Sequence, residues 1–86
     1  MKGQKFFLDA LAKIPTDIDK QVGWSMRVSD KIADVLHESG MSQKDFAKSM
    51  GRSEAEVSRW LSGTHNFTLS TLAKISACLG VDIIHI

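Results

Sequence analysis

The stretch SQKDFAKSMGRSEAEVSRWLSG, residues 42–63, predicts two short amphipathic helices joined by a tight turn. We expect the first helix over residues 43–50, because Ser42 is a residue type whose side chain accepts a hydrogen bond from a free N–H at a helix start. Gly51 follows, and glycine commonly ends helices since it adopts positive φ at little cost. The apolar stripe of this helix consists of Phe46, Ala47 and Met50.

The second helix is expected to follow Ser53 as its N-cap, and Glu56 three residues later completes the pattern of a capping box. It closes at Gly63, again a glycine just past a helix end. The apolar residues recur at helical spacing and face the same core as those of the first helix. They are Val57, Trp60 and Leu61. The opposite face is polar or small and consists of Arg52, Ser53, Glu54, Ala55, Ser58, Arg59 and Ser62.

Two short helices joined by a turn of three or four residues that contains glycine describe a helix-turn-helix. This motif places its second helix in the major groove of DNA. Nothing on the polar face of the second helix prevents close approach to a duplex. An ordinary helical hairpin with a solvated polar face has the same periodicity, so periodicity alone leaves both interpretations open.

The composition is that of one small globular domain of 86 residues, with 43% hydrophobic and 24% charged residues. The formal net charge is +1, and the basic residues form neither a tail nor a block. Nucleic-acid binders often carry a strongly basic domain. A few well-placed phosphate contacts would therefore have to supply most of the affinity for DNA.

Several classes of function are excluded. The single cysteine, Cys78, rules out an intramolecular disulfide and is expected to be a small buried core residue. No apolar run is long enough for a signal peptide or a membrane span, so we expect a cytoplasmic protein that does not engage a membrane. The three histidines are far apart, and no metal-ligand, phosphate-loop or nucleophile motif is present. We therefore expect neither an enzyme nor a cofactor or metal site.

Before the motif, residues 4–14 place apolar side chains at helical spacing and predict a short helix that Pro15 ends. Thr16 then resembles an N-cap, with a carboxylate three residues later, for a long helix over residues 17–39 that Gly40 stops. The inward positions expected on the long helix are Ile18, Val22, Met26, Ile32, Val35 and Leu36.

After the motif, a polar loop over residues 64–67 leads to a last helix that Thr68 caps and Gly80 stops. Its buried stripe is expected to consist of Leu69, Leu72, Ile75 and Leu79. The tail, residues 81–86, is rich in β-branched residues and predicts a short strand. A lone strand cannot satisfy its own backbone, so its partner would be the same strand of a second subunit or a strand beyond Ile86.

Residues 40–81 resemble the helix-turn-helix domain of the lambda-repressor, Cro and XRE family, and the resemblance covers about residues 17–82. Family members share Gln at the start of the first motif helix, Ala between the helices, Gly in the turn and Ser before the second helix. They also share an apolar residue within that helix, Gly at its end, and a later helix rich in Leu. The matching residues are Gln43, Ala47, Gly51, Ser53, Val57, Gly63, Leu69, Leu72, Leu79 and Gly80. The segment SRWLSGTHNFTL, residues 58–69, further resembles small bacterial regulators of the HigA-like antitoxin type.

The resemblance implies DNA contacts at individual positions. Gln43 matches a position that contacts a phosphate. Arg59 is best able to read sequence, because a guanidinium bonds guanine O6 and N7 bidentately. The other positions implied to face base edges or the groove wall are Ser53, Glu54, Ala55 and Ser58. The loop implied to meet the DNA backbone contributes Ser62, Thr64, His65 and Asn66. Lys44 and Arg52 are either further phosphate contacts or solvated surface charges.

Two residues leave alternatives open. Glu54 lies where a polyanion would approach, and three interpretations of this carboxylate remain open. It accepts a hydrogen bond from cytosine N4, or it pairs with an arginine in the free protein. The third is that the domain binds DNA weakly or not at all. Glu56 needs no such explanation, because the capping box accounts for it. Trp60 is expected in the core, with an exposed interface role as the alternative.

The sequence thus predicts an all-α fold, a five-helix repressor-like helix-turn-helix domain with a short C-terminal β-strand. Its parts are a short N-terminal helix over residues 1–15, the helix-turn-helix domain over residues 16–80 and the strand over residues 81–86. The expected function is that of a transcriptional repressor, which binds a double-stranded DNA operator as a homodimer with half-sites roughly 34 Å apart. The alternative is an antitoxin-type module that binds and neutralises a toxin protein, with DNA binding secondary.

Overall fold

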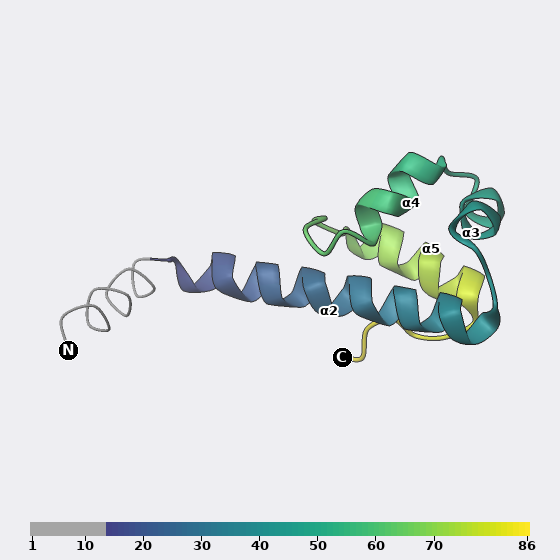
Figure 1. The fold of residues 1–86 in the computed structure, drawn as a ribbon. Coiled ribbons are helices and arrows are strands. Elements are labelled where there is room, and N and C mark those ends of the chain that lie inside the picture. Colours follow the sequence, from purple (N-terminus) through teal and green to yellow (C-terminus); the bar gives the residue numbers. More distant parts are fainter. Residues whose placement is uncertain (1–13) are drawn as a thin grey trace.

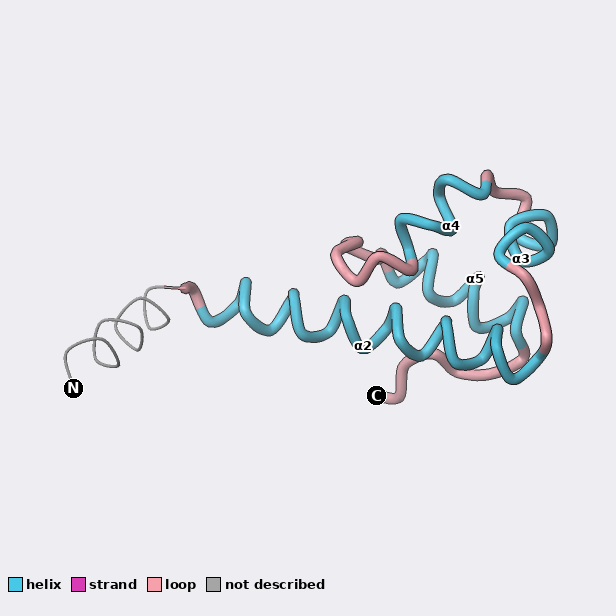
Figure 2. Tube along the Cα trace, viewed as in Figure 1, coloured by secondary structure: helices cyan, strands magenta, loops and turns pink. Residues whose placement is uncertain are grey.

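The computed structural model describes residues 14–86, and this part of the chain is all-α. Its helices are α2 (Thr16–Ser39), α3 (Gln43–Met50), α4 (Glu54–Trp60) and α5 (Leu69–Leu79). The three short helices gather over the C-terminal half of α2, whereas the N-terminal half of α2 extends beyond them (Figure 1). Between the helices the chain forms short loops, and no strand occurs within residues 14–86 (Figure 2).

Within residues 14–86, the structure does not show the elements predicted at the two ends of the chain. The expected helix over residues 4–14 lies outside the described residues, apart from Ile14, which is not helical. The predicted C-terminal strand is wrong. Its β-branched residues serve the core instead, since Ile83 is buried and its backbone N–H donates to Ser76 Oγ at 3.1 Å.

The boundaries of the short helices follow the predicted caps. Ser42 Oγ accepts a hydrogen bond from the N–H of Asp45 at 3.0 Å, and Ser53 Oγ accepts one from the N–H of Glu56 at 3.1 Å. Thr68 caps α5 in the same way. The glycines that follow α2, α3 and α5 adopt left-handed backbone conformations that a side chain would strain, as expected for C-caps. They are Gly40, Gly51 and Gly80, with φ of 65°, 67° and 70°.

The predicted cap of α2 is not formed. The helix already includes Thr16, and its N-cap is Pro15, which makes no side-chain capping hydrogen bond. Proline suits the start of a helix, because its fixed φ is compatible with the first turn. Asp17 and Asp19 still lie in the first turn, where carboxylates interact favourably with the helix dipole.

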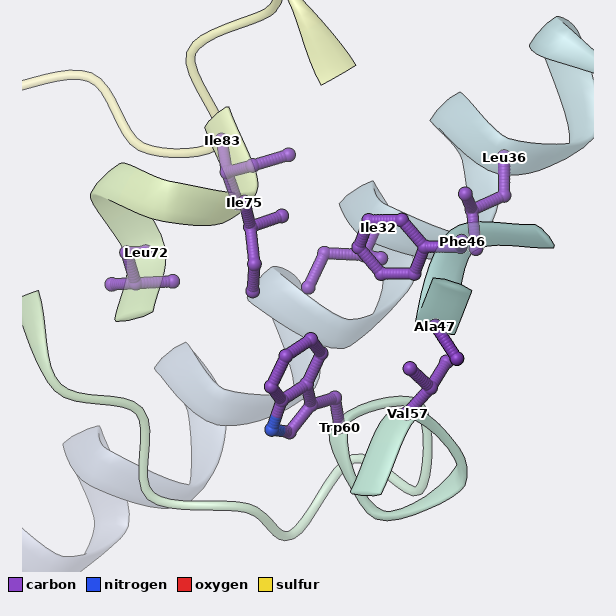
Figure 3. Packing of buried hydrophobic residues seen from close by; sticks show 9 residues of the cluster. All are labelled: Ile32, Leu36, Phe46, Ala47, Val57, Trp60, Leu72, Ile75 and Ile83. Carbon is purple, nitrogen blue, oxygen red and sulfur yellow. The ribbon is translucent and has the colours of Figure 1, made fainter. Parts of the chain in front are cut away.

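One hydrophobic core joins all four helices and the tail (Figure 3). The rings of Phe46 and Trp60 meet at its centre edge to face, with centroids 6.1 Å apart. The motif helices therefore share a core with α2 and α5, as the periodicity predicted. The buried members are Ile32, Leu36, Phe46, Ala47, Val57, Trp60, Leu72, Ile75 and Ile83.

Several predicted core residues are exposed instead. On α2, Ile18, Val22 and Met26 are each about half exposed, although Met26 lies close to Gly63 in the loop after α4. The other corrected positions lie on α5. Leu69 is 71% exposed at the outer end of that helix, and Cys78 is exposed with a free thiol. The apolar spacing of α2 continues into its N-terminal half, where Ser25 is buried but Ile18 and Val22 are not.

Candidate nucleic-acid interface

α4 has one buried face and one exposed face. Val57 and Trp60 point into the core, with Val57 fully buried and Trp60 3% exposed, so the core interpretation of Trp60 is confirmed (Figure 3). The residues predicted to face DNA lie on the other side and are all exposed. They are Glu54, Ala55, Ser58 and Arg59. The structure thus presents a continuous outer face of α4, free of any role in the core.

The turn between α3 and α4 carries an ion pair that the sequence analysis did not predict. Ser53 accepts the expected hydrogen bond from the N–H of Glu56. The carboxylate of Glu56 does not turn back to complete a capping box, because it pairs with the guanidinium of Arg52 at 3.3 Å. This pair compensates part of the charge of Arg52. Within residues 14–86 Glu54 makes no ion pair, so the predicted pairing with an arginine in the free protein is not seen.

The start of α3 lies on the exposed side of the motif. Gln43 and Lys44 occupy its first two positions and are both exposed. Their backbone N–H groups belong to the first turn, which has no acceptors within the helix. Amides and side chains of this kind suit contacts to phosphate oxygens.

α4 is shorter than predicted, since it ends at Trp60 with Leu61 as its C-cap and does not extend to Gly63. The hydroxyl of Ser62 closes this end. It donates to the carbonyl of Arg59 at 2.6 Å and lies 3.1 Å from the hydroxyl of Thr64. Ser62 and Thr64 are therefore fixed relative to the last turn of α4, beside Arg59.

An aromatic chain holds the rest of this loop against α4. The rings of His65 and Phe67 meet edge to face with centroids 4.8 Å apart, and Phe67 lies 6.5 Å from Trp60. His65 is only partly exposed, whereas Asn66 is exposed. His65 thus has a packing role that the sequence analysis did not anticipate, and Asn66 is the freer of the two.

A buried serine on α2 positions the end of α4. Ser29 is 3% exposed, and its hydroxyl donates to the backbone carbonyl of Trp60 at 2.6 Å. The carbonyls at a helix end have no partners within the helix, so this bond satisfies one of them inside the core. The sequence analysis missed Ser29. A pattern in the sequence could have indicated it. Ser25, Ser29, Ile32 and Leu36 follow one another by four, three and four residues, so both serines lie on the same helix face as the apolar residues.

Other kinds of site find no support in the described part of the chain. Nowhere in residues 14–86 do three histidine, cysteine or carboxylate side chains gather as they would around a metal ion. None of the helices described is both long enough and apolar enough to cross a bilayer.

Comparison with protein-family models matches residues 32–86 to the helix-turn-helix family. The match begins in the C-terminal half of α2 and includes every residue predicted to contact DNA. Comparisons with curated proteins and with solved structures gave no match. The family indicates a DNA-binding regulator, in agreement with the outer face of α4. The chain belongs to the helix-turn-helix family of the lambda-repressor, Cro and XRE type.

Proposed function

We propose that this protein is a sequence-specific transcriptional regulator that binds its operator as a homodimer, with α4 of each subunit in the major groove. The observation that carries the proposal is that α4 has one face buried in the core and one face exposed to solvent. Val57 and Trp60 anchor the helix in the core, which leaves Ser58 and Arg59 exposed on the opposite side. A helix held in this way can enter a groove without loss of core packing.

The residues of this surface have different roles in the proposal. Arg59 reads a guanine through O6 and N7, because its side chain is exposed and makes no ion pair within the described residues. Ser53, Ala55 and Ser58 line the groove wall. The phosphate contacts come from Gln43, Lys44, Arg52, Ser62, Thr64, His65 and Asn66.

Glu54 has a specific role in this proposal. It is exposed on the outer face of α4 and its charge is uncompensated within residues 14–86. A carboxylate close to DNA is repelled by phosphates unless it accepts a hydrogen bond from a base, and the amino group of cytosine offers one. We therefore assign Glu54 to a cytosine of the operator. Guanine and thymine offer only acceptors in the major groove, so at those bases the repulsion stays uncompensated, which adds to selectivity.

The test begins with selection of bound sites from random DNA, followed by gel-shift titrations on the selected duplex. Arg59→Ala should relax the preference at one base pair and cost about 1–3 kcal/mol on the selected site. Gln43→Ala should weaken binding to all duplexes alike, since a phosphate contact carries no sequence information.

The matched control is Arg27→Ala, which removes the same charge from an exposed position on α2 outside the motif. It should leave the selected-site affinity nearly unchanged. If Arg59→Ala and Arg27→Ala have equal effects, α4 does not read the DNA and the proposal is wrong.

An antitoxin-type module that captures a toxin protein is the alternative function. It is favoured by the exposed apolar side chains outside the motif, such as Trp24 and Leu69. Salt distinguishes the two functions. Binding to DNA should weaken steeply as salt is added, because condensed counterions are released from the phosphates. Capture of a protein through an apolar face should change little.

A further inference from the structure

Four of the eight large apolar residues that are exposed within residues 14–86 line two adjoining grooves. They are Trp24, Leu69, Val81 and Ile86. One groove, of about 630 Å³, runs along α5 and the tail, and the other, of about 590 Å³, lies between the tail, α5 and α2. The two grooves share Leu69, Leu72, Ile84 and Ile86, so they form one continuous area. Trp24 on α2 lines the second groove. We call this area the α5–tail surface.

The α5–tail surface is almost uncharged. Among the side chains that line its two grooves, Asp82 carries the only formal charge at pH 7 when histidine is counted as neutral. The whole chain, by contrast, has 24% charged residues. A surface without lysine or arginine does not suit phosphates, and one without a charge cluster offers nothing to a strongly charged peptide. The chemistry fits an apolar protein partner.

The exposed apolar area supplies a large part of what a dimer interface needs. Trp24, Leu69 and Ile86 are 62%, 71% and 112% exposed. At roughly 200 Å² for a large apolar side chain, these three residues alone expose on the order of 500 Å². The groove walls, Ile84 and Phe67 among them, add to this sum. A stable interface buries about 800 Å² on each partner, and contiguous apolar patches of more than a few hundred Å² mark sites of protein contact.

We propose that the partner is a second copy of this chain, docked through the same surface on both subunits. The inference rests on the proposed homodimer and names its interface. Leu69 and Ile86 are exposed and also line both grooves, so one copy supplies protruding side chains and grooves together, as a two-fold interface requires. Asn66 and Phe67 line the second groove and belong to the loop that follows α4. This surface is therefore connected to the end of α4 through that loop.

Sedimentation velocity tests this interface without DNA. The wild-type chain should be a dimer. Leu69→Ser and Ile86→Asp replace side chains that contribute little to the core, so both variants should fold, as judged by unchanged helical circular dichroism. Each should raise the dimer dissociation constant on the order of 30-fold or more, the factor expected for a central interface side chain.

The matched control is Met26→Ser. Met26 is 54% exposed on α2 but lines neither groove, so this variant should dimerise like the wild type. A wild-type chain that stays monomeric at every concentration overturns the inference. The same holds for a dimer that survives both groove variants, or one that Met26→Ser disrupts equally.

DNA binding separates this inference from the proposed function. A wild-type monomer that still binds DNA through Arg59 would overturn the interface and leave the regulator intact. The opposite outcome is a wild-type dimer that Leu69→Ser dissociates but for which no DNA site can be selected. It would support the interface and contradict the proposed function as a regulator. If both proposals hold, Leu69→Ser should keep its Arg59-dependent preference on a single half-site and lose the gain in affinity from two half-sites.

Discussion

The two halves of α2 carry the same pattern and differ in burial. Along the helix, positions 18, 22, 25, 29, 32 and 36 follow one another by four and three residues, so they lie on one face. Ile32 and Ile18 are fourteen residues apart, which places them on the same side of the helix. Ile32 is fully buried beneath the short helices, whereas Ile18 is 49% exposed beyond them. The comparison shows that an apolar stripe determines which side of a helix can be buried. Whether that side is buried depends on the other helices that pack against it.

The largest expected difference between the halves is in stability. Ile32→Ala should lower the free energy of unfolding by about 2–5 kcal/mol, because it leaves a cavity among Phe46, Ile75 and Val57 that the packed core cannot fill. Ile18→Ala, the same substitution on the same helix face, should change it by less than about 0.5 kcal/mol. Urea denaturation followed by circular dichroism measures both.

If Ile32→Ala does not fold, Ile32→Val serves in its place, with an expected loss of about 0.5–1.5 kcal/mol. Equal losses at positions 18 and 32 would contradict the comparison. They would show that Ile18 is packed in solution as tightly as Ile32.

The buried serines of α2 offer a second, smaller contrast. Ser29→Ala should destabilise the protein by about 1–3 kcal/mol, because it leaves the buried carbonyl of Trp60 without a partner. Ser25 is 8% exposed and makes no comparable bond to another helix within the described residues, so Ser25→Ala should cost less than about 0.5 kcal/mol.

A second measurement separates positioning from stability. Ser29→Ala should speed hydrogen exchange at Leu61 and Ser62 more than at Phe46, since the bond holds the end of α4. Uniform acceleration across the protein would instead mean that Ser29 contributes to stability alone.

What the sequence predicted correctly depends on contacts between near neighbours. Ser42, Ser53 and Thr68 cap helices through bonds to residues three positions later, and Gly40 and Gly80 end helices through their own backbone conformation. The face of α4 that avoids the core was predicted for the same reason, because 3.6-residue periodicity is a local property.

What it failed to predict depends on neighbours distant in the chain. Leu69 and Cys78 have apolar surroundings in sequence, but no described element covers them. Ile83 lies in a strand-like tail, yet it is buried because α5 offers it a place in the core and a serine hydroxyl for its N–H. The bond from Ser29 to Trp60 spans 31 positions, and no local pattern encodes it.

The smallest contrast concerns two glycines of the same helical segment. A Cβ added at Gly23, within the exposed half of α2, meets no atom within 4 Å, and the residue has no positive φ to preserve. Gly23→Ala should therefore stabilise the protein by about 0.5–1 kcal/mol through lower backbone entropy in the unfolded chain. Gly40 also has open space around it, but its φ of 65° strains any side chain, so Gly40→Ala should destabilise by about 1 kcal/mol. Urea denaturation of the two variants should thus give shifts of opposite sign. Shifts of the same sign would mean that space around the Cβ, and not backbone conformation, determines the outcome at these positions.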